Sequence, residues 1–95
     1  MNLSLHILSP LEDIFNGEVV SLSSRNSAGN FDILPEHANF ITLIDKDPII
    51  VRMPGGEKKV FEFPQAVLRC HDGKIEVFTD FSQAEMLLPE GKLLI

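Results

Sequence analysis

The chain has 95 residues, a formal net charge of −6 at neutral pH and an apolar fraction of 44%. A chain of this length forms one compact domain, and this apolar fraction is typical of a globular protein rather than a disordered one. The acidity argues against a nucleic-acid or anionic-lipid partner, because both attract clustered lysine and arginine. No apolar run approaches the ~20 residues that cross a bilayer, so we expect any membrane contact to come through another protein.

Short stretches of alternating polarity begin at the N-terminus. Leucine and isoleucine alternate with polar residues over 3–7, which is the period-two pattern of a half-buried strand. The pair Asn16-Gly17 is a strong turn signal and predicts a tight reversal or a bulge before a second strand over 18–22. Residues 1–6 lack a basic leader followed by a continuous apolar core, so we expect no secretory signal and a cytoplasmic protein.

Two hairpins are expected in the second half of the chain. Residues 48–53 and 59–63 flank a Pro-Gly-Gly-Glu turn, and residues 66–70 and 74–78 flank an Asp-Gly pair. Six prolines and six glycines leave few segments long enough for three helical turns. We therefore predict an all-β fold, a small antiparallel β-sandwich of short strands joined by tight turns.

The sandwich is assigned to residues 1–80. Residues 81–95 are expected to form a short C-terminal tail, in which one helical turn over 82–88 is the most that can precede Pro89.

The chain offers few groups for catalysis or metal binding. Its three histidines, His6, His37 and His71, are far apart and have no neighbours at ligand spacing, which argues against a metal site. No glycine-rich loop precedes a Lys-Ser/Thr pair, and no serine lies in a nucleophile elbow. We expect no catalytic residue, no metal, no cofactor and no bound nucleotide. The single cysteine, Cys70, is expected to be a small buried apolar residue.

The most distinctive segment covers residues 29–42. A turn at Ala28-Gly29 leads into an apolar stretch, and Pro35 fixes a second turn. In one interpretation the apolar side chains Phe31, Ile33 and Leu34 merely plug the sandwich. In the other, the neighbouring polar residues are displayed for binding at one end of the domain, where loops often carry function: Asn30, Asp32, Glu36 and His37.

With these residues the chain resembles the epsilon subunit of bacterial F-type ATP synthase, specifically its N-terminal β-sandwich domain. The resemblance covers nearly the whole chain and rests on Ser9-Pro10, the turn and strand over 15–19, the stretch 29–38 and the late strands 67–70 and 75–78. It implies the same fold that the strand pattern predicts.

The resemblance implies a non-catalytic rotor subunit of the central stalk, which couples the gamma shaft to the c ring for proton- or sodium-driven ATP synthesis. It would lie peripherally at the cytoplasmic face of the bacterial inner membrane and touch the membrane only through the c ring. Carried over residue by residue, one set would face the c ring: Ala28, Gly29, Asn30 and Phe31. A second set would face gamma: His37, Ala38 and Thr42.

The chain departs from the family pattern at several points. Asn30 replaces a usual acidic residue, and Gln65-Ala66 stands where a Gly-Gly pair is common. Asp32 and Glu36 stand where the family usually has glycine. The family's C-terminal two-helix hairpin, which carries inhibitory and ATP-sensing functions, has no counterpart in these 95 residues. If these residues are the complete chain, we expect coupling without that brake.

Two alternatives stay open. The chain could be a divergent β-sandwich adaptor that binds another protein partner. It could also be an enzyme that uses His37 with Asp32 or Glu36 as an acid–base pair, although an exposed loop offers no evident pocket to shift their pKa values.

Overall fold

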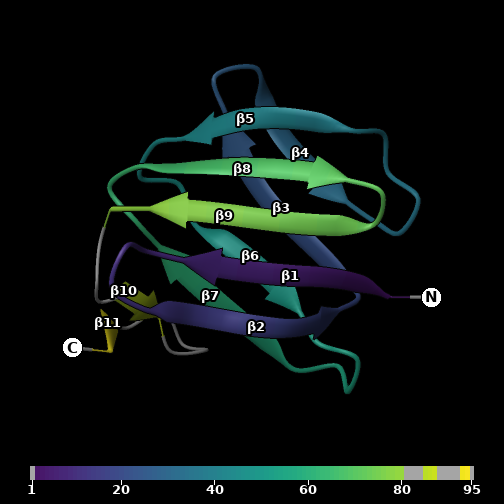
Figure 1. Ribbon diagram of the computed structural model, residues 1–95, viewed down its shortest axis with the longest axis horizontal. Helices are drawn as coiled ribbons and strands as arrows, with labels where there is room; N and C mark the ends of the chain where they lie inside the picture. The colour runs from purple at the N-terminus through teal and green to yellow at the C-terminus, as the bar shows by residue number, and fades with distance from the viewer. Residues whose placement is uncertain (1, 81–84, 88–92, 95) are drawn as a thin grey trace.

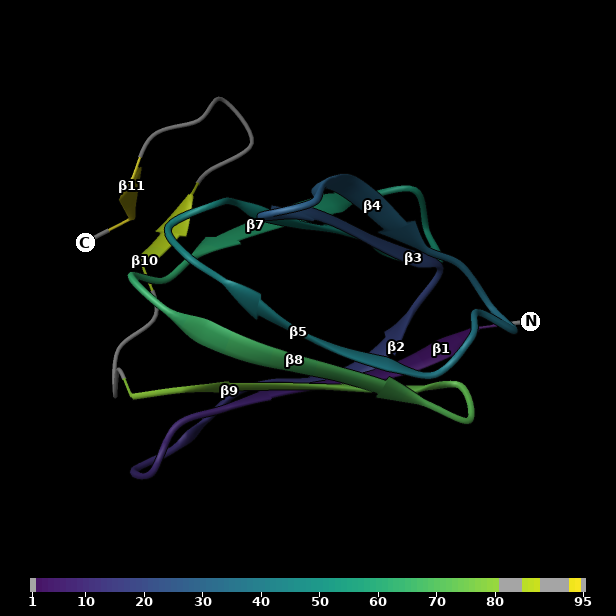
Figure 2. The ribbon, with the colours of Figure 1, turned by 90° about the horizontal axis from the view of Figure 1, so that it is seen from above.

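The computed structural model describes residues 2–80, 85–87 and 93–94, which form two β-sheets stacked face to face (Figures 1 and 2). Sheet A has the order β2-β1-β9-β8-β5. Its strands are β1 (Leu3–Leu8), β2 (Asp13–Val19), β5 (Phe40–Ile44), β8 (Ala66–His71) and β9 (Lys74–Thr79). Sheet B has the order β11-β10-β7-β6-β3-β4. Its strands are β3 (Ser21–Asn26), β4 (Gly29–Ile33), β6 (Ile49–Arg52), β7 (Lys58–Glu62), β10 (Glu85–Leu87) and β11 (Leu93–Leu94). The predicted all-β sandwich is confirmed.

The core lies between the sheets and follows from the alternation of side chains along each strand. On β1 the inward residues Leu3, Leu5 and Ile7 are at most 1% exposed, and Leu68 on β8 is fully buried. Fully burying an aliphatic side chain of this size stabilises the fold by about 1.5–3 kcal/mol. Cys70 is also buried in this core, as expected for a small apolar residue.

The two predicted hairpins are confirmed. Strands β6 and β7 pair in antiparallel register, and so do β8 and β9. In the second hairpin Asp72 has a φ of 50° and Gly73 a φ of 77°. Positive φ at both central positions is the requirement of a two-residue type I′ turn, which explains why Asp-Gly occurs there.

The turn predicted at Asn16-Gly17 is wrong. Both residues lie inside β2, where Asn16 pairs with His6 and Gly17 with Leu5. The chain reverses earlier, where the Ser9 N–H donates to the Glu12 carbonyl oxygen at 2.9 Å. The register of the β1–β2 pair shifts between Ile7 and Leu8. The β-bulge or irregularity of this hairpin therefore lies next to the turn and not at Asn16-Gly17.

The single strand predicted over 18–22 is also wrong. The chain leaves sheet A after Val19 and enters sheet B at Ser21, so the run contributes to both sheets. The Val20 N–H donates to the Arg52 carbonyl oxygen at 2.8 Å, which secures the crossing to β6. Val19 and Leu22 are both buried, because each points inward from its own sheet.

One strand pair departs from the predicted antiparallel pattern. Strand β1 runs parallel to β9, with Leu5 opposite Ile75 and Ile7 opposite Val77. The other pairs among the described strands are antiparallel. This pair places the N-terminal strand in the interior of sheet A, beside the last strand of the second hairpin (Figure 1).

The helical turn expected over 82–88 is wrong for residues 85–87, which form strand β10 antiparallel to β7. The rest of that segment lies outside the described residues. Strand β11 pairs with β10 at the border of sheet B. The domain boundary expected after residue 80 stays a prediction.

Candidate functional site

The residues predicted to bind partners lie along one edge of the sandwich. Strands β4 and β5 are the outermost strands of their sheets on this side, and the loop 34–39 joins them (Figure 2). Ala28 is in the β3–β4 turn, and Gly29, Asn30 and Phe31 begin β4. His37 and Ala38 are in the joining loop, and Thr42 is in the middle of β5.

The β3–β4 turn is fixed by the side chain of Asn26. Its Oδ1 accepts a hydrogen bond from the Ala28 N–H at 2.9 Å, which is the pattern of an Asx turn. Gly29, opposite Asn26 in the strand register, has a φ of 122°, which glycine adopts without the steric penalty of a side chain. The Asn26 Nδ2 donates to Thr42 Oγ1 at 2.9 Å, so the same side chain also reaches β5.

Aromatic rings close the same edge of the sandwich. The rings of Phe31 and Phe40 meet edge to face, with centroids 5.7 Å apart at 83°. The His37 ring lies 5.0 Å from that of Phe40. Phe31 and Phe40 are both half-buried and pack against the core, and edge-to-face pairs of this kind contribute about 0.5–1.5 kcal/mol beyond their buried area.

The structure divides this segment into buried and exposed residues, and binding by the exposed ones stays a prediction. Ile33 is fully buried and Phe31 packs against the core, so these two do plug the sandwich. Leu34, in contrast, is 56% exposed, and Asn30 is exposed as well.

The acid–base alternative receives no geometric support among the described residues. The His37 Nδ1 is 2.7 Å from the Ala38 carbonyl oxygen. The Asp32 carboxylate accepts a hydrogen bond from the Ser23 hydroxyl at 2.5 Å, and Ser23 is its partner across sheet B. Glu36 and His37 line an open hollow of about 390 Å³, but no hydrogen bond or ion pair joins them. Within the described part of the chain, no group of three or more His, Cys, Asp or Glu residues is placed to hold a metal ion.

A second surface, which the sequence analysis did not identify, is the outer face of sheet A. Leu43 on β5 lies opposite Val67 on β8, Val67 lies opposite Phe78 on β9, and Phe78 lies opposite Leu8 on β1. We call these four residues the apolar row. Leu43 is 53% exposed, and Val67 and Phe78 are each 42% exposed. All four line a hollow of about 380 Å³ together with Ser9 and Pro10.

A signal for the apolar row was present in the sequence. Consecutive apolar residues such as Leu43-Ile44, Val67-Leu68 and Val77-Phe78 put one apolar side chain on each face of a strand. Since one face of each strand fills the core, the second apolar residue of each pair lies on the surface. Contiguous exposed apolar residues of this kind mark interaction sites.

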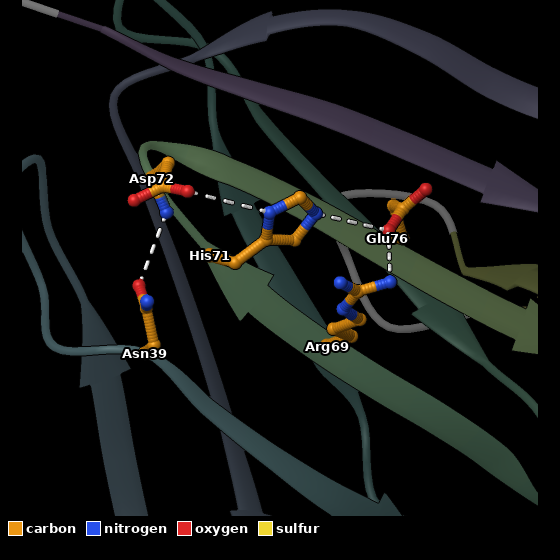
Figure 3. Close-up of polar contacts among 5 residues, drawn as sticks. All are labelled: Asn39, Arg69, His71, Asp72 and Glu76. Atoms are coloured by element: carbon orange, nitrogen blue, oxygen red, sulfur yellow. Dashed lines mark hydrogen bonds and ion pairs between the residues drawn. The ribbon is translucent and has the colours of Figure 1, made fainter.

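A polar cluster lies beside the apolar row on sheet A, since Arg69 and Glu76 follow Val67 and precede Phe78 by two residues on the same strands. Figure 3 shows the residues of this cluster. The Glu76 Oε1 is 3.3 Å from His71 Nε2 and 3.7 Å from the guanidinium of Arg69. The Asp72 carboxylate is 3.8 Å from His71 Nδ1, and the Asp72 N–H donates to Asn39 Oδ1 at 3.1 Å. A partly exposed ion pair such as Arg69–Glu76 contributes about 0–1 kcal/mol to stability. Their larger effect is to give the face a charged half beside its apolar half.

No helix in the described residues has the length and hydrophobicity needed to cross a membrane.

Comparison with known proteins gives one consistent family. Residues 2–85 match the family model described as the ATP synthase delta/epsilon chain, β-sandwich domain. The ATP synthase epsilon chain of Psychrobacter cryohalolentis is 27% identical over 92 residues, which cover 97% of this chain and 67% of the relative. That of Acinetobacter baylyi is 28% identical over 88 residues, covering 93% of this chain and 63% of the relative. The chain thus spans about two thirds of the length of these relatives.

Solved structures show the same fold. A chain of the Euglena gracilis mitochondrial ATP synthase, in a structure of OSCP, F1 and the c-ring, superposes with a TM-score of 0.80 at 18% identity. The match covers 90% of this chain and 53% of that chain. A chain of the Tetrahymena thermophila mitochondrial ATP synthase central stalk and c-ring gives a TM-score of 0.68 at 11% identity, covering 82% of this chain and 63% of that chain.

Proposed function

Because the chain belongs to the family of the ATP synthase delta/epsilon chain β-sandwich domain, we propose that it is a non-catalytic rotor subunit of the central stalk of an F-type ATP synthase. In this function it binds the gamma shaft and the c ring together, so that rotation of the ring, driven by protons or sodium ions, reaches the catalytic subunits. The observation that carries the proposal is the exposed apolar row on a chain of this family.

Gamma is the proposed partner of the outer face of sheet A. The apolar row supplies a surface that a partner can bury, and the cluster of Arg69, His71 and Glu76 beside it supplies charges that favour one orientation. Of the residues assigned to gamma by resemblance, Thr42 lies on the border strand β5 with its side chain bonded to Asn26 of sheet B, and His37 lies in the loop that precedes β5. A stable interface of standard size buries about 800 Å² on each partner, so both halves of the face are needed.

The c ring is the proposed partner of the β3–β4 turn. Ala28 and Asn30 are exposed there, and the Asn26 side chain holds the turn in one conformation. Contact with the ring would restrict the motion that this exposed turn still has, because association orders the loops at an interface. Through this contact the subunit would lie peripherally at the cytoplasmic face of the bacterial inner membrane.

The test is restoration of coupling in membranes that contain an ATP synthase depleted of this subunit. We expect the added chain to restore ATP-driven ion transport, measured by quenching of a pH-sensitive dye or by sodium uptake into vesicles. Asn30→Trp, which places a bulky side chain at the start of β4 beside the β3–β4 turn, should reduce the restored transport. Glu57→Trp is the matched control, because Glu57 is also exposed but lies in the β6–β7 turn at the opposite end of sheet B.

A folded chain that binds neither gamma nor the c ring contradicts the proposal and favours an adaptor with another protein partner. A chain that binds both but restores no transport contradicts the coupling function alone.

A further inference from the structure

The two proposed partner surfaces are joined inside the molecule by the side chain of Asn26. Its Oδ1 accepts from the Ala28 N–H in the turn proposed for the c ring. Its Nδ2 donates to Thr42 Oγ1 on the strand proposed for gamma. The oxygen and the nitrogen of the Asn26 amide are therefore both used, one for each surface. The Ala28 N–H can bond only to an acceptor, so the amide oxygen must face Ala28 and the amide nitrogen must face Thr42.

The hydrogen-bonded chain continues beyond Thr42. The Thr42 hydroxyl donates to the Leu43 carbonyl oxygen at 3.4 Å, and Leu43 is the β5 member of the apolar row. The bonds thus run from the Ala28 backbone through Asn26 and Thr42 to the first residue of the proposed gamma face. The Asn26–Thr42 bond is partly buried, where water competes with it less than at an exposed site.

A second link runs beside the first. Phe31 belongs to the set assigned to the c ring, His37 belongs to the set assigned to gamma, and the Phe40 ring contacts both. These contacts join β4 of sheet B to β5 of sheet A at an edge where no backbone ladder connects the two sheets. Side-chain contacts therefore hold the two sheets together at this edge. Phe31 and His37 belong to the two proposed partner surfaces, and Phe40 contacts both.

From this arrangement we infer that Asn26 is a positioning residue that couples binding of the c ring to binding of gamma. The inference rests on the proposed function. A partner that orders the β3–β4 turn also orders Thr42 through the Asn26 amide. The second partner then binds strand β5 when the Thr42 side chain is already fixed. The second binding step then loses less conformational entropy, which gives positive cooperativity without a change of fold. Coupling of this kind is reciprocal, and each partner raises affinity for the other by the same factor.

The experiment measures the affinity of the full chain for gamma with and without a saturating amount of c ring in detergent, by isothermal titration calorimetry. For the wild type we expect gamma to bind at least about fivefold more tightly when the c ring is present. Asn26→Ala removes both hydrogen bonds, and we expect the affinity for gamma to become independent of the c ring. Thr42→Val removes the hydroxyl but keeps the Asx turn, and it should reduce the coupling factor while leaving the affinity for the c ring alone unchanged.

Ser27→Ala is the matched control, because Ser27 is exposed in the same turn and its change should leave the coupling factor at the wild-type value. Hydrogen exchange provides an independent readout. The Ala28 amide should be protected in the wild type and in Thr42→Val, and unprotected in Asn26→Ala.

Three outcomes overturn the inference. If the wild type binds both partners with no coupling, the two surfaces are independent while the proposed function stands. If Asn26→Ala folds and keeps the wild-type coupling factor, the amide does not carry the coupling. If the wild type binds neither partner, the proposed function fails and the inference fails with it.

Discussion

Replacing Val67 by aspartate places a charge at the centre of the proposed gamma face. Val67 lies between Leu43 and Phe78 in the apolar row. Its side chain points away from the core and is 42% exposed, so an aspartate there remains hydrated in the free protein. We therefore expect Val67→Asp to fold and to lose affinity for gamma.

The expected loss of affinity has two parts. Full burial of a valine contributes about 1.5–3 kcal/mol, so the 42% that remains exposed offers a partner about 1 kcal/mol. An aspartate in the same interface would be a buried charge without a partner, which costs about 3–5 kcal/mol. The sum of about 4–6 kcal/mol corresponds to a weakening of at least about a thousandfold.

The expected loss of stability is smaller. Aspartate is disfavoured in a strand by up to about 1 kcal/mol, which lowers the melting temperature of a domain of this size by about 4–8 °C. The assay is calorimetric titration with gamma, preceded by thermal unfolding to establish that the variant is folded.

Ile50→Asp is the matched control. Ile50 is an outward-facing strand residue of sheet B with a similar exposure of 38%, so the same substitution introduces the same charge on the opposite face. We expect its affinity for gamma to equal that of the wild type. A folded Val67→Asp that binds gamma as tightly as the wild type, or an Ile50→Asp that loses as much affinity, would refute the assignment of gamma to sheet A.

Three further predictions concern the free protein. Glu36→Gly should raise the free energy of unfolding, measured by urea titration, by up to about 1 kcal/mol. Glu36 has a φ of 69°, and glycine adopts this angle without steric strain, although it also makes the unfolded chain more flexible. A decrease would show instead that the Glu36 side chain stabilises the loop. Ser24→Ala should lower the free energy of unfolding by about 1–3 kcal/mol, since the buried Ser24 hydroxyl donates to the Pro48 carbonyl oxygen at 2.9 Å. Ser23→Ala removes a more exposed hydroxyl and should have a smaller effect. Equal effects of the two substitutions would contradict this reasoning. Burial raises the pKa of the Cys70 thiol above its ordinary value of 9.0, so the unfolded chain loses the thiol proton at lower pH than the folded chain. The stability that the buried thiol contributes is complete below pH 9.0 and is lost as the pH rises through the folded pKa. The free energy of unfolding of the wild type should therefore fall more steeply in alkali than that of Cys70→Ala.

The hairpins were predictable because their signals are local. Asp72-Gly73 supplies the two positive φ values that a type I′ turn needs, and alternation over 3–7 shows which side of β1 enters the core. In each case the neighbouring residues alone decide the conformation.

The features that the sequence did not reveal depend on distant parts of the chain. Nothing near Val20 distinguishes a strand that stays in one sheet from one that changes sheets, because the crossing depends on the bond to Arg52. The pair Asn16-Gly17 favours a turn locally, but pairing with β1 keeps it in a strand. The link between Asn26 and Thr42 spans 16 residues, so it exists only once β3 and β5 face each other across the sandwich.

The direction of the apolar row bears on how this domain can transmit torque. The row crosses four neighbouring strands of sheet A, β5, β8, β9 and β1, at right angles to their length. A partner bound to the apolar row therefore applies force to several strands at once. The backbone hydrogen bonds between β5 and β8, β8 and β9, and β9 and β1 share that force. A contact confined to β5 would instead pull on an edge strand held by the single ladder to β8. This difference favours a gamma contact centred on Val67 in the sheet interior over one confined to the border strand β5.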